Sequence, residues 1–155
     1  MNKEVQSIAR NIENTLNAQP WFGRPVIALL DEIETKKAST KPNEKEHSAL
    51  ELIWHMNTWA EFTLANLENR TDSDLKKIEA NDWRKLSKQK HTWKKGLSDF
   101  KSIHKQIVDN LNKRDDDFLS DIVPNRRYNF RFMLNGLIQH NIYHAGQMAY
   151  IKKLL

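Results

Sequence analysis

The chain of 155 residues contains no cysteine and only four glycines and four prolines. The absence of cysteine excludes disulfide scaffolds, cysteine-ligated zinc fingers, iron–sulfur clusters and cysteine nucleophiles. So few glycines and prolines leave little material for a turn-rich β architecture, and neither common glycine-rich nucleotide-binding motif occurs. Histidine is the chemically versatile residue that remains, with six copies, and tryptophan occurs five times.

Long apolar runs are also missing. The run from Val26 to Leu30 has five residues, whereas a membrane-spanning helix needs about 20. The first ten residues contain no apolar stretch of the kind found in a signal peptide. The sequence therefore predicts no membrane segment and a location in the cytoplasm.

Apolar residues recur at steps of three and four, the period of an α-helix, and no period-two pattern competes. The pattern predicts four long helices and a short one, over residues 2–18, 25–36, 48–69, 89–112 and 129–153. Residues 37–46 are expected to form a polar linker, and the mostly polar segment 70–88 to be partly irregular. Ser48 and Glu51 have the spacing of a capping box. We expect one all-α domain over residues 1–155, a four-helix bundle with one short extra helix.

Two histidines interrupt the apolar stripe of the last predicted helix. His140 and His144 are four residues apart, so their rings lie on one face, one turn from each other. Two imidazoles in this arrangement can share a metal ion, although the glutamate that zinc proteases place between them is absent. A shared cation would satisfy one nitrogen of each ring, whereas an unpaired buried polar group costs about 1–3 kcal/mol. Two core histidines without metal are the alternative.

A third ligand would have to come from another helix. His47 at a helix start and His91 in a lysine-rich turn are expected to be solvated. His55 and His104 both occupy apolar positions of long helices. Spacing alone does not choose between these two.

Three segments carry a recognisable pattern. They are residues 136–147 (GLIQHNIYHAGQ), residues 48–59 (SALELIWHMNTW) and residues 21–25 (WFGRP). Together they resemble the DinB-like (damage-inducible) superfamily, which includes the YfiT-type proteins. The first segment is a fairly specific signal, and the resemblance extends over the whole chain.

The resemblance implies a bundle with a long crossover connection and one divalent metal ion per chain, either Zn, Ni, Fe or Mn. The family's three histidine ligands correspond to His55, His140 and His144, which selects His55 and leaves His104 as a core residue. The resemblance further implies thiol-dependent S-transfer or hydrolysis through a metal-activated thiolate or water. A low-molecular-weight thiol or another small molecule would be the substrate, and the protein would form a homodimer.

Several residues near these ligands are candidates for supporting roles. Gln147 and Asn57 could hold ligand rings through their free N–H groups. Trp54, Trp59 and Tyr143 could line a pocket mouth, with ordinary bundle core as the alternative. No Asp or Glu is evident next to the ligands, so general-base work would fall to metal-bound water alone. Catalytic residues beyond the ligands are not assigned.

Two other functions compete with a metal-dependent enzyme. One is a stress-response protein in which the metal stabilises the bundle without chemistry. The other, less favoured, is a nucleic-acid-binding module, because residues 1–80 carry a net charge of −3 and residues 81–155 a net charge of +8. Basic residues cluster with two tryptophans in the lysine-rich segment 84–95 and beside it. The simpler interpretation of this segment is a solvated helix start.

Overall fold

The computed structural model describes residues 3–70 and 75–155. The elements within these ranges are α1 (Lys3–Asn17), α2 (Val26–Asp31), α3 (Ala49–Leu67), α4 (Leu75–Asn81), α5 (Trp93–Leu111), the 3-10 helix η1 (Asp117–Ser120) and α6 (Phe130–Leu154). The β pairing seen in this part of the chain is one isolated bridge between Ile122 and Asn129. The prediction of an all-α chain is confirmed.

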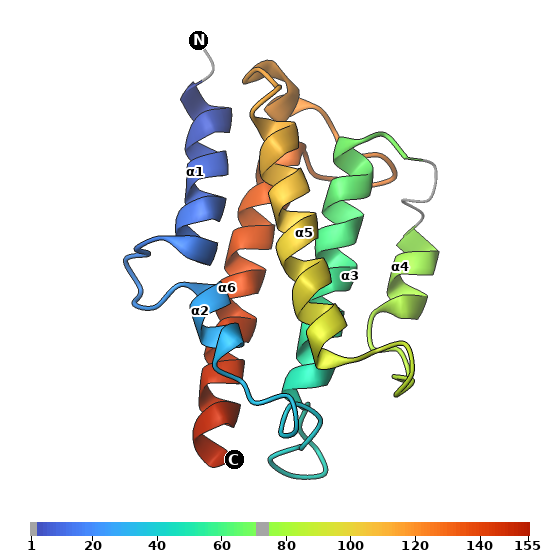
Figure 1. Cartoon of the computed structure of the whole chain (residues 1–155). Helices are drawn as coiled ribbons and strands as arrows, with labels where there is room; N and C mark the ends of the chain where they lie inside the picture. Colours follow the sequence, from blue (N-terminus) through green and yellow to red (C-terminus); the bar gives the residue numbers. More distant parts are fainter. Residues whose placement is uncertain (1–2, 71–74) are drawn as a thin grey trace.

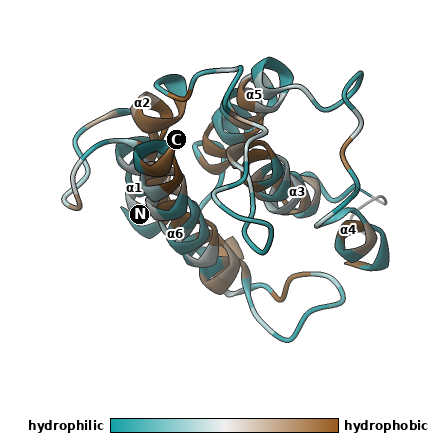
Figure 2. Ribbon diagram, turned by 90° about the horizontal axis from the view of Figure 1, so that it is seen from below, coloured by the Kyte–Doolittle hydropathy of each residue, from teal (hydrophilic) through white to brown (hydrophobic). Residues whose placement is uncertain are grey.

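The four long helices, α1, α3, α5 and α6, lie side by side (Figure 1). Helix α3 packs against α5 and α6, and α1 packs against the same two helices. The short α2 packs against α1 and α6. Hydrophobic and hydrophilic stretches alternate along the long helices (Figure 2), as expected where one face of each is buried.

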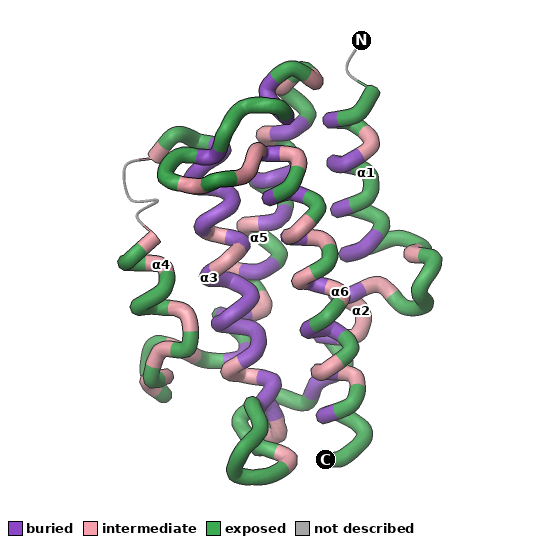
Figure 3. The backbone as a smooth tube through the Cα atoms, turned by 180° about the vertical axis from the view of Figure 1, so that it is seen from behind, coloured by how far each residue is buried: buried purple, intermediate pink, exposed green. Residues whose placement is uncertain are grey.

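Helix α3 is the most deeply enclosed element. Fifteen of its nineteen residues are buried, and the buried colour follows it along its length in Figure 3. The predicted capping box begins it: the Glu51 N–H donates to Ser48 Oγ (3.2 Å), and the Ser48 N–H donates to Glu51 Oε2 (2.8 Å). A polar side chain on such a helix faces protein on almost any side, so it needs a protein partner.

Helices α3 and α5 approach each other closely at Gly96. A Cβ atom at this position would lie 2.9 Å from Ile53 Cγ2 and 3.2 Å from Trp54 Nε1. The Asn57 amide donates to the Gly96 carbonyl (2.8 Å) at the same crossing. The absence of a side chain at Gly96 therefore sets the distance between the two helices.

Three boundaries differ from those predicted. Helix α2 covers only Val26–Asp31 of the expected 25–36. Helix α5 begins at Trp93 and not near residue 89, because Thr92 caps it by accepting from the Lys95 N–H (3.2 Å). Helix α4 lies within segment 70–88, and none of its residues is buried, so no apolar period marked it in the sequence. Residues 71–74 of that segment lie outside the described ranges.

The first turn of α1 is capped from a distant part of the chain. The Asp116 carboxylate accepts from the backbone N–H of Val5 (2.8 Å) and from that of Glu4 (3.2 Å). These two hydrogen bonds, the one from Val5 above all, lower the pKa of Asp116. Arg131 on α6 pairs with the Glu4 side chain. The start of α1 is thus held by the connection after α5 and by the start of α6.

Across the described ranges, no helix combines the length and the apolar character required to cross a membrane.

Candidate metal centre

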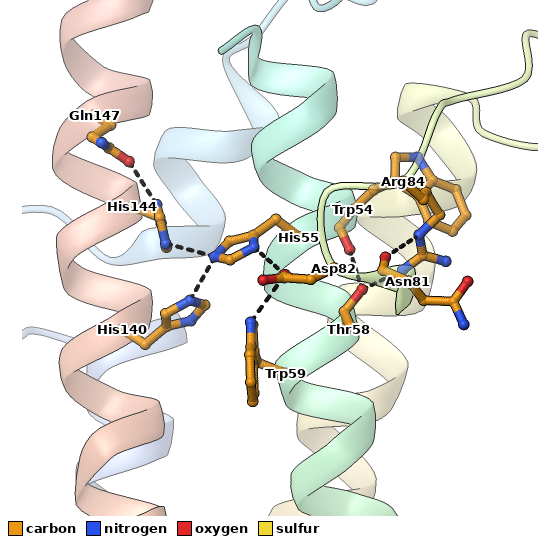
Figure 4. Close-up of polar contacts among 10 residues, drawn as sticks. All are labelled: Trp54, His55, Thr58, Trp59, Asn81, Asp82, Arg84, His140, His144 and Gln147. Atoms are coloured by element: carbon orange, nitrogen blue, oxygen red, sulfur yellow. Dashed lines mark hydrogen bonds and ion pairs between the residues drawn. The ribbon is translucent and has the colours of Figure 1, made fainter. Parts of the chain in front are cut away.

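Three histidine rings meet between α3 and α6. His55 projects from α3, and His140 and His144 project from successive turns of α6 (Figure 4). The Nε2 atom of His55 lies 2.9 Å from Nε2 of His140 and 3.0 Å from Nε2 of His144. These three residues form a group that could hold a metal ion. Of the two candidates that spacing left open, it is therefore His55 that lies beside the α6 pair.

A carboxylate holds the His55 ring from behind. Asp82, just after α4, accepts at its Oδ1 from Nδ1–H of His55 and also from Nε1–H of Trp59 (3.0 Å). The expectation that no acidic residue lies next to the ligands is therefore wrong. Asp82 is 27 residues from His55 in sequence, in a segment without an apolar pattern, so no spacing could have indicated it.

The second histidine of α6 is held in a similar way. Nδ1–H of His144 donates to Gln147 Oε1 (2.5 Å), and the Gln147 amide nitrogen lies 3.4 Å from the Tyr143 hydroxyl. Gln147, a predicted supporting residue, therefore contacts the ring of a candidate ligand. Tyr143 itself is 65% exposed, and its ring lies edge-on to that of His144, with 4.9 Å between the centroids.

These contacts determine which nitrogen of each ring is free. Carboxylate and amide oxygens only accept hydrogen bonds, so Asp82 and Gln147 require the proton on Nδ1 of His55 and of His144. The Nε2 atoms of both rings then present lone pairs to each other at 3.0 Å. Two facing lone pairs repel unless a proton or a cation lies between them. The donor set of neutral imidazoles with fixed outer nitrogens is the one that divalent metal ions use in proteins.

The electrostatics favour the neutral form of each ring. Burial, reinforced by the neighbouring histidines, lowers the pKa of His55 to about 4 and that of His140 to about 3. Burial also lowers the pKa of His144, against the opposing hydrogen bond to Gln147. At pH 7 the three rings are therefore uncharged, the state in which an imidazole nitrogen binds a metal.

Comparison with known families agrees with this geometry. A family model described as the DinB superfamily matches residues 24–148.

The chain belongs to the DinB superfamily.

The match contains the three histidines as well as Asp82 and Gln147. Searches of curated proteins and of solved structures gave no match. The resemblance inferred from the sequence is confirmed at the level of the family.

The remaining predicted residues of this DinB-superfamily chain lie at varied distances from the centre. Trp59 is half-buried and contacts Asp82. Asn57 is buried on another side of α3, where its amide donates to Gly96 of α5. Trp54 is also buried, with His91 packed edge-on against its ring. The structure thus places Trp59 beside the histidines and Asn57 against α5.

The other three histidines have distinct environments. His104 is buried in the core, as predicted; its Nδ1 donates to the Phe100 carbonyl (2.8 Å), and its Nε2 accepts from Asn141 (2.9 Å). His91 is half-buried and accepts from the Ser87 N–H (2.8 Å), so the expectation that it is solvated is wrong.

His47 is exposed, as expected, but it belongs to a stack of three rings. The Trp83 ring lies between His47 (3.8 Å between centroids) and His55 (4.0 Å). Trp83 directly follows Asp82, so the same short segment contacts His55 at its Nδ1 edge and on its ring face. Sequence reasoning assigned Trp83 only to the basic segment.

The basic residues of segment 84–95 do not form one uniform free surface. The Arg84 side chain donates to Thr58 Oγ1 and to the Asn81 carbonyl. Lys95 pairs with Asp99 at 2.6 Å, and Trp93 is buried in the core. Trp93 is therefore not available to stack on a base.

Proposed function

We propose that this chain binds one divalent metal ion, either Zn, Ni, Fe or Mn, within a four-helix bundle that has a long crossover connection. The ligands would be the Nε2 atoms of His55, His140 and His144. The observation that carries the proposal is the convergence of three neutral Nε2 atoms, two of whose rings are fixed from behind by Asp82 and Gln147. Family membership supports the same assignment.

We further propose that the centre is catalytic, in a thiol-dependent S-transferase or a hydrolase. Three protein ligands leave a position for substrate, as in catalytic rather than closed structural sites. When bound, a divalent cation would supply Lewis acidity, which lowers the pKa of a thiol or water molecule held beside it. Because the chain has no cysteine, the thiol would have to be a small molecule from outside.

The chain's own residues have separable tasks in this proposal. His55 and His144 keep their lone pairs directed inward because Asp82 and Gln147 hold their outer N–H groups. The Asp82 carboxylate also places a negative charge behind His55, which makes the ring a stronger donor to a cation. Trp83 covers the face of His55 and limits the approach of water from that side.

Metal analysis tests the first part. Protein purified without chelator is expected to contain about one equivalent of metal by elemental analysis. His144→Ala should lose this metal while helicity by circular dichroism is retained, and His91→Ala, which changes a histidine outside the cluster, should keep it. Metal-free wild-type protein, or unchanged metal content in His144→Ala, would overturn the proposal.

Activity assays test the second part. Metal-loaded protein is assayed with a small thiol and an aromatic electrophile for S-transfer, and with an activated ester for hydrolysis. We expect turnover that disappears in the metal-stripped protein and in His144→Ala. Bound metal without either activity would contradict the catalytic proposal and favour the metal-stabilised, non-catalytic protein. The predicted homodimer is a separate matter that chromatography with light scattering decides.

A further inference from the structure

A cavity of about 190 Å³ lies between α3 and α6, next to the histidine cluster. Its wall consists mainly of aromatic and aliphatic side chains, namely Trp59, Phe62, Tyr128, Phe132, Met133 and Leu137. The two helices that form it are the same two that supply the three histidines. The backbones of these two helices can be followed in Figure 3.

The cavity offers almost no polar group to an occupant. No Asp, Glu, Lys or Arg lines it among the residues that the structure describes. Thr63 belongs to the wall, but its hydroxyl already donates to the Trp59 carbonyl (2.9 Å). Phe132, although it lines an apolar space, is 66% exposed. An exposed aromatic ring beside an apolar cavity is typical of a ligand-binding site.

The cavity adjoins the candidate metal centre through two shared residues. His140 is part of its wall, and Trp59 joins it to Asp82. His140 also differs from the other two ligands: its Nδ1 is buried without a hydrogen-bond partner in the described part of the chain, whereas His55 and His144 have Asp82 and Gln147. His140 therefore brings to this side of the cavity a ring whose outer nitrogen has no hydrogen-bond partner among the residues that the structure describes.

We infer that this cavity receives an uncharged aromatic or branched aliphatic group of the substrate, next to the substrate atom that reacts at the histidine centre. The inference rests on the proposed function where it places the reacting atom at the histidine centre. The binding of the apolar group in the cavity does not depend on the proposed function. It assigns the substrate to a class: small molecules with an apolar ring or branch beside a thiol, hydroxyl or carbonyl group.

The volume fits such a group. A cavity of roughly 150 Å³ lined by apolar side chains holds benzene, and this one is somewhat larger. A charged group would lose its hydration here without gaining a counter-charge, which is far more costly than burying a neutral ring. Arg126 stacks on the Phe62 and Tyr128 rings but is not itself part of the wall. A neutral occupant is therefore favoured over an anion.

Gly136 allows the cavity to be filled by mutation. It lies in the cavity wall, and a Cβ atom there would meet nothing within 4 Å. Gly146, on the same helix, has the same open surroundings but does not line the cavity. Gly136→Leu should fill the cavity and Gly146→Leu should not. Both changes raise helix propensity, so both variants are expected to fold.

The first experiment measures binding of phenylmethanol by calorimetry, with the Trp59 indole N–H followed by NMR, in metal-free and zinc-loaded protein. Wild type and Gly146→Leu are expected to bind it in both forms, and Gly136→Leu to bind at least about tenfold more weakly. Benzoate and benzylammonium, which add a charge to the same ring, should bind more weakly than phenylmethanol. Absence of binding, an unchanged affinity in Gly136→Leu, or tighter binding of benzoate would overturn the inference.

The second experiment tests whether a molecule bound at the metal centre places its apolar group in the cavity. Zinc-loaded wild type should bind phenylmethanethiol more tightly than 2-sulfanylethanol, and Gly136→Leu should abolish this preference. A preference that survives in Gly136→Leu would show that the substrate's apolar group lies elsewhere. If the protein binds no zinc but Gly136→Leu still binds phenylmethanol more weakly than the wild type, the proposed function is wrong. The assignment of the cavity as a binding site for an apolar group is then retained.

Discussion

Asp82 accepts a hydrogen bond from Nδ1–H of His55, a residue 27 positions earlier in the chain. The contact ties the segment after α4 to the middle of α3, and the same carboxylate oxygen accepts from Trp59. A buried polar ring on an enclosed helix thereby obtains its partner from outside the four long helices. The orientation of His55 depends on a segment that supplies no ligand.

Asp82→Ala is therefore expected to weaken metal binding without removing a ligand. Loss of a carboxylate behind a ligating histidine costs about 10–100-fold in metal affinity. Competition with a chromophoric chelator measures the affinity. Asp99→Ala, which removes an acidic residue paired with Lys95 on α5, is the control and should leave it unchanged. Equal affinities of wild type and Asp82→Ala would contradict the role assigned to Asp82.

Gln147 allows a graded version of the same test. Gln147→Leu leaves Nδ1–H of His144 without its acceptor and should lower the metal affinity, whereas Gln147→Glu keeps an acceptor and should restore it. Gln106→Leu, at an exposed position of α5, serves as the control. If Gln147→Leu and Gln147→Glu behaved alike, the contact with His144 would have no part in holding the ring.

The burial of His104 predicts that the protein loses stability in acid. Burial lowers its pKa to about 4 from an ordinary value of 6.5, so between these values the unfolded chain takes up a proton that the folded chain does not. Protonation of His104 leaves the free energy of unfolding unchanged above pH 6.5 and lowers it as the pH falls toward 4, by up to about 3 kcal/mol.

Urea unfolding of metal-free protein at pH 7 and at pH 4.5 checks this prediction. His104→Gln, which cannot take up a proton at this position, should lose less free energy of unfolding between the two pH values than the wild type. The histidines of the cluster titrate in both proteins, so the difference isolates His104. An identical loss in both would contradict a buried neutral His104.

Gly96→Ala should destabilise the protein although it adds only one methyl group. The new Cβ would lie within 2.9 Å of Ile53 and force α3 and α5 apart, at a cost of about 1–3 kcal/mol. Gly146→Ala, whose Cβ meets nothing, should instead stabilise by up to about 1 kcal/mol. Thermal or urea unfolding of the two variants compares them directly, and a stable Gly96→Ala would show that the crossing can relax.

The sequence was sufficient for the parts that repeat or are local. The long helices follow from apolar spacing, the start of α3 from Ser48 and Glu51, and the pairing of His140 with His144 from the helix period. The position of His55 opposite them depends on the rotation of α3, which spacing along a single helix does not determine. The choice between His55 and His104 therefore came from the resemblance to a family.

What could not be predicted depends on contacts between distant segments. Asp82 and Trp83 follow a helix without buried residues, so no pattern marked the segment that reaches His55. His91, in the turn before α5, is half-buried because it packs on Trp54 of α3. The cavity beside His140 exists because side chains of α3 and α6 leave a space, a property of packing that is not encoded at any one position.

The hydrogen bonds that Asp116 accepts from the start of α1 bear on the order in which the chain folds. Their partners Val5 and Asp116 are separated by 111 residues, and a helix of fifteen residues is marginal in isolation. Closing so long a loop comes late, because its entropy has to be offset by contacts already formed. Helix α1 therefore becomes stable only once the connection after α5 is in place. We expect α1 to become stable later than α3 and α5, although it precedes both in the sequence.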